Sequence, residues 1–574
     1  MLLEIENLTV KYPSRRGAFV ALKNVSLSLD RGEILGLVGE SGAGKSTVGS
    51  AVIGLLAKPG YVDGGHIALM GQQLVGRPEA EMEQLRGARI GMIFQDPMTS
   101  LNPLETVGWQ LSETIILHKK CARREAATRA VALMESVGIR DARERFDHYP
   151  HQFSGGMRQR VVIALAICGD PDVIVADEPT TALDVSVQST ILQLLKTICR
   201  ERGVGMILVT HDMGVIAEVA DRVAVMYRGE VVEVGKTHDI LTAPAHKYTQ
   251  SLISAVPRAD CKIARFPLIN YIEEAGTPDI SRLKKRWGRT SDAANGTALS
   301  VRNLSVDFVT SRSWIGRQTK VFRAVRDVSF DIKRGETMGI VGESGSGKST
   351  IARTVAGIYA PTKGEIFFNG HPLTNVGPRL AKLRRRDLQM IFQDPFSSLN
   401  GRMRVQQIIA EPILFQKGRK AHAEASQTAN DLLEIVGLGA AAGRKFPHEF
   451  SGGQRQRISI ARALATGSNF IICDEPTSAL DVSIQAQLLN LLKDLQQELG
   501  LTLLFISHDL PVVRQMCDQI CVMRKGEIVE QQGSDGLFES PRHEYTRALL
   551  DLIPSTPRGQ HQAALRVGAT PGRT

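Results

Sequence analysis

The sequence of 574 residues contains no long hydrophobic run. Its longest apolar stretches, such as residues 161–168, are much shorter than the roughly 18 to 20 residues that cross a bilayer. The first six residues, MLLEIE, lack a basic segment, and carboxylates interrupt their apolar side chains, so we expect no secretory signal. These absences predict a protein without membrane spans that stays on the cytoplasmic side.

Cysteine is also scarce, and its distribution excludes a disulfide framework. The seven cysteines are an odd number and lie far apart, which fits a reducing compartment. Only Cys517 and Cys521 are close together, and that spacing alone is more typical of buried packing than of half a metal site. We therefore expect no metal cluster; a single cysteine, Cys261, follows the C-terminal helix of the first half.

Composition is that of a folded protein with several domains. Hydrophobic residues make up 43% and charged residues 23% of the sequence, and the length exceeds what one hydrophobic core supports. The formal net charge of +10 favours an anionic neighbour. That neighbour could be a nucleic acid, a nucleotide or the acidic cytoplasmic leaflet of a membrane, and charge alone does not distinguish them.

The sequence is an internal repeat. The first half contains GLVGESGAGKST, IFQDPMTSLN, FSGGMRQR, ADEPTTALDVS and VTHDM; the second contains GIVGESGSGKST, IFQDPFSSLN, FSGGQRQR, CDEPTSALDVS and ISHDL, in the same order. Ser154, Asp177 and His211 are separated by 23 and 34 residues, and the corresponding residues of the second half have the same separations. This predicts two duplicated domains, residues 1–257 and 298–574.

Residues 258–297 between the halves are predicted to be a linker. They contain several prolines and glycines and a basic cluster that ends in Trp287. Such a cluster could contact anionic lipid headgroups, although a basic run is usually a solvated surface.

Each half contains a phosphate-binding loop, residues 39–46 and 342–349. A short apolar run, residues 34–38 or 337–341, precedes each loop and helix-compatible sequence follows it, which is the context this motif requires. Glycines allow the backbone N–H groups to surround phosphate, and a lysine supplies positive charge to the β and γ phosphates. The predicted ATP-binding residues are Gly39, Ser41, Gly42, Gly44, Lys45, Ser46 and Thr47, and Gly342, Ser344, Gly345, Gly347, Lys348, Ser349 and Thr350.

An Asp-Glu pair follows a second apolar run in each half, residues 173–176 and 470–473. Such runs predict buried parallel strands, so Asp177 and Asp474 are expected at carboxyl ends of strands, where they can hold magnesium. The next residues, Glu178 and Glu475, are expected to polarise the water that attacks the γ-phosphate.

Two further polar residues recur in each half. His211 and His508 follow other apolar strands, at positions from which an imidazole can reach a γ-phosphate. Gln95 and Gln393 are uncharged amides suited to contact magnesium or the attacking water. The predicted magnesium ligands are Ser46, Gln95, Asp177, Ser349, Gln393 and Asp474.

Together with these motifs, Ser154-Gly155-Gly156 and Ser451-Gly452-Gly453 resemble the signature of the ATP-binding cassette (ABC) ATPases, and the resemblance covers both halves. It implies an α/β fold with two P-loop domains, each with a mainly parallel sheet, an antiparallel β subdomain and a helical signature subdomain. It also implies a head-to-tail arrangement in which each signature caps the ATP held by the opposite half. By the same resemblance, Tyr12 and Phe308 stack on adenine, although strand aromatics are more often core residues.

The usual signature is LSGGQ, and both copies depart from it. The first has Phe153 and Met157; the second has Phe450 but retains Gln454. Because both halves keep the glutamate and the histidine, we expect two hydrolytic sites. If one is weaker, it should be the site of Lys348, which would receive the signature with Met157.

Three classes fit two cassettes without a membrane span: an importer ATPase, a twin-cassette translation factor that binds ribosomes, and a DNA-repair ATPase. The linker lacks the long charged arm of the translation factors, and the cysteines lack the spacing of repair-type zinc modules. The segments DPMTSLNP and DPFSSLN, and PAHKYTQSL and PRHEYTRALL at the cassette ends, resemble the ATPases of the oligopeptide, dipeptide and nickel import group. The chain resembles a fusion of that group's two ATPases.

This resemblance implies ATP and Mg²⁺ as cofactors and peripheral attachment to the cytoplasmic face of the inner membrane. The implied partners are two integral membrane permease subunits and an extracytoplasmic solute-binding protein, with no nucleic acid. Because the cargo is selected by those partners, we take di- or oligopeptides as the default and leave nickel, glutathione and opines open.

Overall fold

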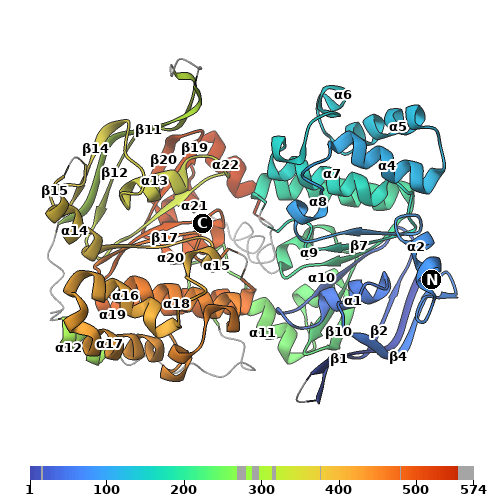
Figure 1. Cartoon of the computed structure of the whole chain (residues 1–574), viewed down its shortest axis with the longest axis horizontal. Helices are drawn as coiled ribbons and strands as arrows, with labels where there is room; N and C mark the ends of the chain where they lie inside the picture. The colour runs from blue at the N-terminus through green and yellow to red at the C-terminus, as the bar shows by residue number, and fades with distance from the viewer. Residues whose placement is uncertain are drawn as a thin grey trace, which may run out of the picture. The chain divides into compact units, whose positions relative to one another are not determined.

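The computed structural model describes residues 1–14, 17–181, 183–267, 280–287, 296–312, 318–374, 376–478 and 480–553. These residues fold into two compact units, Met1–Val256 and Pro257–Ile553 (Figure 1). Residues 268–279 and 288–295 of the predicted linker, together with Ala182 and Ala479, lie outside the described residues. None of the described helices is both long and apolar enough to span a membrane.

Two sheets form the framework of the first unit. The antiparallel sheet has the order β2-β1-β4-β5, with β1 Leu3–Ser14, β2 Gly17–Leu29, β4 Tyr61–Leu69 and β5 Gln72–Gln73. The larger sheet has the order β10-β9-β3-β8-β7-β6, with β3 Ile34–Val38, β6 Ile90–Ile93, β7 Val173–Asp177, β8 Gly205–Val209, β9 Arg222–Tyr227 and β10 Glu230–Lys236. Its strands are parallel except for β10, which pairs antiparallel with β9.

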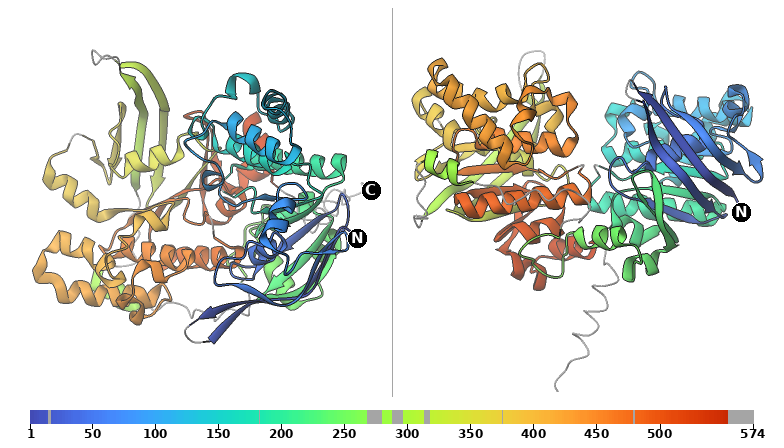
Figure 2. Two further views of the ribbon diagram at one scale, coloured as in Figure 1. Left: turned by 45° about the vertical axis from the view of Figure 1, so that its right-hand side comes forward. Right: turned by 90° about the horizontal axis from the view of Figure 1, so that it is seen from below.

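The helices of the first unit divide between this larger sheet and a separate helical part. Helices α4, α5 and α7 gather at one end of the unit, away from β1, β2 and β4 (Figures 1 and 2). The helices are α1 Lys45–Val52, α2 Glu79–Leu85, α3 Pro97–Ser100, α4 Val107–Lys119, α5 Arg123–Ser136, α6 Ala142–Arg145, α7 Gly155–Ile167, α8 Val185–Arg202, α9 Met213–Val219, α10 Thr237–Thr242 and α11 Lys247–Ala255, with a 3₁₀ turn at Pro150–Gln152.

The second unit repeats both sheets. The antiparallel sheet is β12-β11-β14-β15, with β11 Thr297–Arg312, β12 Gln318–Lys333, β14 Lys363–Phe368 and β15 His371–Pro372. The larger sheet is β16-β17-β18-β13-β19-β20, with β13 Thr337–Val341, β16 Leu388–Ile391, β17 Phe470–Asp474, β18 Thr502–Ile506, β19 Gln519–Arg524 and β20 Glu527–Gly533.

Its helices follow the same order. They are α12 Ser281–Trp287, α13 Lys348–Val355, α14 Pro378–Asp387, α15 Pro395–Ser398, α16 Val405–Lys417, α17 His422–Ile435, α18 Gly452–Leu464, α19 Val482–Leu499, α20 Leu510–Met516, α21 Ser534–Glu539 and α22 Glu544–Asp551; 3₁₀ turns lie at Arg419–Ala421, Ala440–Arg444 and Pro447–Glu449. The predicted α/β class, with a mainly parallel sheet, an antiparallel sheet and a helical part in each half, is confirmed.

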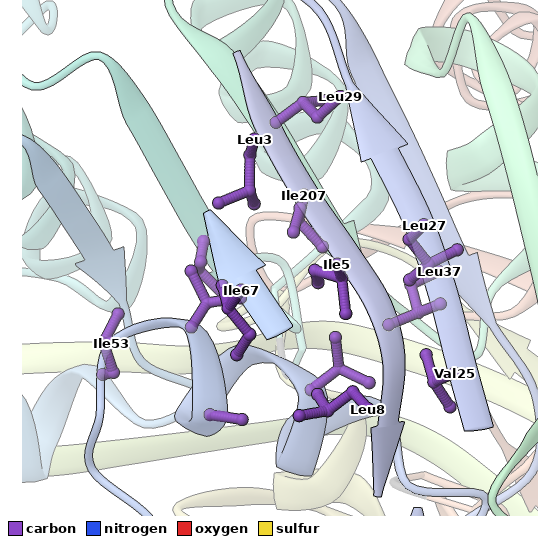
Figure 3. Packing of buried hydrophobic residues seen from close by; sticks show 14 of the residues in the cluster. Leu3, Ile5, Leu8, Val25, Leu27, Leu29, Leu37, Ile53, Ile67 and Ile207 are labelled. Atoms are coloured by element: carbon purple, nitrogen blue, oxygen red, sulfur yellow. The ribbon is translucent and has the colours of Figure 1, made fainter. Parts of the chain in front are cut away.

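The core of each unit lies between its two sheets. In the first unit, Leu3 and Ile5 of β1 pack with Ile67 of β4, Leu37 of β3 and Ile207 of β8 (Figure 3). The central strands β3, β8, β13 and β18 are buried along their whole length, as expected for parallel strands covered on both faces. This core fixes the carboxyl ends of the strands, where the candidate sites lie.

The segment of residues 257–267, which follows α11, belongs to the second unit and is called here the docking segment. The side-chain amide of Asn490 bonds both backbone groups of Phe266, and Gln515 bonds the backbone at Arg258, Cys261 and Ile263. Phe266 is fully buried. Part of the predicted linker is therefore ordered structure on the surface of α19 and α20.

Candidate functional site

The two phosphate-binding loops connect β3 to α1 and β13 to α13. The loop glycines have positive φ, for example +99° at Gly44 and +106° at Gly347, each of which is the N-cap of the following helix. A Cβ at Gly39 would lie 2.3 Å from the carbonyl oxygen of Met226, and at Gly342 2.2 Å from that of Met523. No other residue type fits this backbone, so the predicted loops are present in both units.

Each loop positions its lysine and its hydroxyls at the start of a helix. The Lys45 ammonium donates to the carbonyl oxygens of Gly39 (2.8 Å) and Glu40 (2.9 Å), and Lys348 does the same at Gly342 and Glu343. Both lysines are buried. Ser41 and Ser344 are exposed at the loop tips, and Thr47 and Thr350 are half-buried in the first turns of the helices.

The aspartate of each Asp-Glu pair bonds the loop serine. Ser46 Oγ donates to Asp177 Oδ1 (3.0 Å), and Ser349 Oγ donates to Asp474 Oδ1 (2.8 Å). Burial raises the pKa of both aspartates, and the charge of the adjacent glutamate raises it further, against the effect of the serine hydroxyl. Two carboxylates crowded together in this way provide an environment suited to a cation.

A divalent cation fits this chemistry. Asp474 Oδ2 is buried and has no hydrogen-bond partner in the described structure. The unsatisfied carboxylate oxygen and the serine hydroxyl that bonds the other oxygen of Asp474 are hard oxygen donors of the kind that Mg²⁺ prefers.

In the first unit, three side chains converge on the Glu178 carboxylate. Gln95 Nε2 donates to Oε2 (2.7 Å), Thr181 Oγ1 donates to Oε2 (2.9 Å), and His211 Nδ1 lies 2.9 Å from Oε1. Burial alone would raise the pKa of Glu178. The hydrogen bond and charge of His211, with the hydroxyl of Thr181 and the charge of Lys45, instead lower this pKa to about 2.

The second unit gathers the corresponding residues with fewer contacts. Gln393 Nε2 donates to Glu475 Oε2 (2.9 Å), and His508 Nδ1 lies 3.2 Å from the same oxygen. The Ser478 hydroxyl donates to the Glu475 backbone carbonyl (2.9 Å) instead of the carboxylate. Burial would raise the pKa of Glu475, but His508 and Lys348 lower it; burial would lower the pKa of His508, but Glu475 raises it.

Both glutamates have strained backbones. Their φ values are +48° at Glu178 and +47° at Glu475, in the left-handed region that residues with long side chains rarely adopt. Strain of this kind persists where the surrounding structure fixes it, and it concentrates at functional sites. The structure thus brings together, in each unit, the predicted lysine, serine, aspartate, glutamate, glutamine and histidine.

The signature residues cap helices elsewhere in each unit. Ser154 and Ser451 are the N-caps of α7 and α18, and both serines and Gly155 are exposed, while Gly452 is half-buried. Among the described residues, neither serine bonds the phosphate loop of its own unit. A Cβ at Gly156 would lie 2.5 Å from Val187, and one at Gly453 2.3 Å from Ile484, so these glycines allow the signature helix to approach the next helix closely.

The aromatic residues predicted to stack on adenine are partly buried. Tyr12 on β1 packs against the core of the first unit and against Gly60, and Phe308 on β11 packs edge-on against Tyr359 with ring centroids 5.2 Å apart. This geometry is compatible with both the adenine-stacking and the core interpretation.

Two functional contacts were not predicted from the sequence. Thr181 lies three residues after Glu178, and nothing in the sequence distinguishes it from an ordinary turn residue. The structure shows that its hydroxyl donates to the Glu178 carboxylate. Tyr248 and Tyr545, in the C-terminal helices α11 and α22, accept hydrogen bonds from the loop N–H groups of Glu40 (3.3 Å) and Glu343 (3.4 Å). The recurrence of His-x-Tyr-Thr in both halves was the available signal.

The arrangement in each unit is suited to phosphoryl transfer from a nucleotide to water. Backbone N–H groups at a helix N-terminus and a buried lysine can bind phosphate, a carboxylate and a hydroxyl are placed for a cation, and an ionised glutamate beside a histidine can accept a proton. Two such constellations occur in one chain.

Comparison with known proteins agrees with this chemistry. The ABC transporter family matches residues 22–181 and 325–478, and the C-terminal region of oligopeptide/dipeptide transporters matches residues 232–279 and 529–574. The chain belongs to the ABC transporter family. More particularly, it is the ATP-binding subunit of an importer with two fused cassettes, and it hydrolyses ATP.

Individual relatives resemble the whole chain. The glutathione import ATP-binding protein GsiA of Escherichia coli (strain K12) is 45% identical over 96% of this chain and 89% of its own length. GsiA of Salmonella choleraesuis is 44% identical over 98% of this chain and 91% of its own length. A solved structure, a dimeric bacterial ABC transporter cassette, is 28% identical and covers 41% of this chain and 98% of its own, with a TM-score of 0.38.

Proposed function

We propose that this chain drives the uptake of short peptides, with glutathione or di- and oligopeptides as cargo, through two separate permease subunits. The observation that carries the proposal is the pair of complete hydrolytic constellations, each followed by a C-terminal region of the oligopeptide/dipeptide type. Similarity to glutathione import ATPases supports the same cargo class, because glutathione is itself a small peptide. The default of di- or oligopeptides and the alternative of glutathione thus describe related solutes.

The roles proposed for the site residues follow from their contacts. Glu178 and Glu475 accept the proton of the attacking water, since their lowered pKa keeps them ionised. His211 and His508 orient them and face the γ-phosphate. Ser46, Asp177 and Gln95, with Ser349, Asp474 and Gln393, would hold Mg²⁺, which supplies charge neutralisation to the phosphates when bound.

We further propose that each signature completes the ATP site of the opposite half. A Cβ at Gly155 would meet only Leu183 at 4.0 Å, and one at Gly452 only Leu480 at 3.9 Å, so packing within the unit does not require glycine at either position. An accessible N-cap with a small residue behind it leaves backbone N–H groups available to a phosphate from outside the unit. Lys45 would then work with Ser451, Gly452 and Gly453, and Lys348 with Ser154, Gly155 and Gly156.

The surface that follows each glutamine is proposed to receive the permeases. Phe94, Met98 and Leu104 are exposed in the first unit, as are Phe396 and Phe415 in the second. Exposed large apolar side chains support a partner that covers them. In this proposal a short apolar helix from each permease docks there, so that the chain would lie at the cytoplasmic face of the inner membrane and the permeases would connect it to a solute-binding protein.

We assign residues 1–257 and 298–574 to the two cassettes. Within residues 258–297, the docking segment and α12 both contact α19 of the second unit. A soluble twin-cassette ATPase acting on ribosomes is not favoured, because the family matches are to transporters.

Purification of the tagged chain from its native membranes tests the class of partner. We expect two integral membrane proteins to co-purify, whereas recovery with ribosomes would contradict the proposal. The cargo is tested by reconstituting that complex in liposomes and measuring ATP hydrolysis with solute-binding protein loaded with glutathione, a dipeptide or nickel. Stimulation by nickel alone would contradict the peptide class, and the Glu178→Gln, Glu475→Gln double variant is the matched control.

A further inference from the structure

A buried tyrosine in the C-terminal helix of each cassette contacts the phosphate-binding loop. Tyr248 of α11 is 0% exposed and Tyr545 of α22 is 8% exposed. Their hydroxyl oxygens accept hydrogen bonds from the backbone N–H of Glu40 and of Glu343, respectively. The same contact occurs in both units, at matching positions of the repeat.

The peptide group that each tyrosine holds is also the one that contacts the catalytic lysine. The N–H of Glu40 and the carbonyl of Gly39 belong to a single planar peptide group. Lys45 Nζ donates to that carbonyl oxygen at 2.8 Å, and Lys348 donates to the carbonyl of Gly342 at the same distance. The tyrosine hydroxyl therefore contacts one edge of the peptide group and the lysine ammonium contacts the opposite edge.

Both tyrosines are themselves fixed by their surroundings. His246 and His543 cap the two helices by accepting from the N–H of Tyr248 and Tyr545, each at 3.1 Å. The Glu233 carboxylate on β10 accepts from the N–H groups of Ala245 and His246, and Glu530 on β20 does so from those of Arg542 and His543.

The rings are held as well as the helix ends. The ring of Tyr248 lies 4.4 Å from that of Tyr227, and the guanidinium of Arg524 lies 4.8 Å from the centroid of Tyr545. Contacts to the ring and to the start of the helix thus leave each tyrosine hydroxyl little freedom to move.

We propose that Tyr248 and Tyr545 are positioning residues of the ATP sites: their hydroxyls set the orientation of the first peptide group of the loop and, through it, the position of the phosphate-binding lysine. The C-terminal region that distinguishes this transporter group thereby forms part of the nucleotide site. The inference rests on the proposed role of Lys45 and Lys348 as phosphate ligands.

The experiment replaces only the hydroxyls, as Tyr248→Phe, Tyr545→Phe and the double variant of the full chain. Loss of one hydrogen bond per site predicts about a three- to tenfold rise in the KM for ATP of the double variant, with kcat changed less than twofold and the melting temperature nearly unchanged. Tyr61→Phe, at an exposed side chain at the start of β4, is the matched control and should change neither constant.

An unchanged KM for ATP in a folded double variant would overturn the proposal. A rise in KM accompanied by a comparable fall in kcat and a clearly lower melting temperature would also overturn it, because that result would indicate a structural role alone. Lys45→Ala and Lys348→Ala separate this inference from the proposed function. If the lysine variants bind ATP normally, the assignment of the loops as phosphate-binding loops fails. If the lysine variants no longer bind ATP but the tyrosine variants bind it as well as the wild type does, only the positioning role of the tyrosines fails.

Discussion

The two candidate ATP sites of this chain contain the same set of side chains but hold their glutamates differently. Glu178 receives Gln95, His211 and the Thr181 hydroxyl, which together contact both carboxylate oxygens. Among the side chains that the structure describes, Gln393 and His508 contact the Glu475 carboxylate, and both contact the same oxygen. Motif identity therefore does not ensure identical geometry, since one residue outside the motif changes how the carboxylate is held.

The signatures differ in a related way. In the second unit, Ser451 and Gln454 form a reciprocal capping box, in which the Ser451 N–H donates to Gln454 Oε1 (3.1 Å) and the Gln454 N–H donates to Ser451 Oγ (3.4 Å). Met157 stands at the position of Gln454 and has no amide to complete such a box, so only the Ser154 cap remains. In the proposed head-to-tail arrangement, both weaker features fall on the site of Lys348.

The largest expected effect is the fall in ATP turnover when both glutamates are replaced. Glu178→Gln combined with Glu475→Gln should reduce ATP turnover at least about 100-fold while ATP binding persists, because the general base is removed and the loops are intact. Of the single variants, Glu178→Gln should cost more, since the site of Lys45 is expected to be the faster one. Steady-state hydrolysis and equilibrium binding of ATP by the full chain measure both quantities.

Turnover retained by the double variant would contradict the general-base role. Equal losses in the two single variants would instead remove the proposed inequality of the sites without affecting the assignment.

The second comparison concerns α19 and α20, which carry the docking segment. Asn490 and Gln515 bond that segment, whereas the residues at the same helix positions in the first unit, Gln193 and Glu218, bond each other (3.1 Å). Phe266→Ala should therefore destabilise the second unit by about 3 kcal/mol, because it empties a buried aromatic site. Thermal unfolding should show one transition lowered by roughly 6 °C or more.

The matched control for this variant is Phe19→Ala, a change at a side chain that is 63% exposed on β2. It should leave both transitions in place. A Phe266→Ala chain that unfolds like the wild type would show that the docking segment contributes nothing to the stability of the second unit.

Much of the fold and of the sites was predictable from the sequence because it depends on short-range patterns. The mainly apolar runs at residues 34–38 and 337–341 coincide with β3 and β13, since a short run of this kind followed by a glycine-rich turn leaves little choice of structure. The aspartates at the ends of β7 and β17 follow for the same reason.

The contacts that were not predicted depend on single polar groups far apart in the chain. Tyr248 and Glu40 are 208 residues apart, and no periodicity links them. The docking segment is held by amide side chains on backbone groups, which leave no hydrophobic pattern in a segment rich in charge and proline. Such contacts become visible only when the core has brought the elements together.

A smaller effect is expected from removing the Thr181 hydroxyl, the contact that Glu178 has and Glu475 lacks among the described residues. Thr181→Ala should raise the pKa of Glu178 from about 2, because a donor to the ionised form is lost, and should reduce turnover about three- to tenfold. Ser478→Ala, whose hydroxyl bonds a carbonyl, should leave turnover nearly unchanged.

The sign of the accompanying stability change is defined. Because the pKa of Glu178 is lower in the folded than in the unfolded state, its ionised form stabilises the fold above the unfolded-state pKa, and this stabilisation is lost as the pH falls toward 2. Thr181→Ala removes part of it and should therefore destabilise the first unit at neutral pH and less so in acid. Chemical unfolding at several pH values measures this, and a Ser478→Ala variant as impaired as Thr181→Ala would remove the distinction between the sites.

The smallest expected effect is a gain. Met157→Gln would give the first signature the amide that Gln454 provides in the second, so that its side-chain oxygen can accept from the Ser154 N–H as Gln454 does from Ser451. A firmer cap at the start of α7 should raise turnover no more than about threefold, through the site of Lys348, because a capping contact contributes only about 1 kcal/mol. Measuring it in a Glu178→Gln background, where that site provides the remaining hydrolysis, makes so small a change visible. A gain found instead in a Glu475→Gln background would mean that the first signature serves the site of Lys45, and the head-to-tail pairing would have to be reversed.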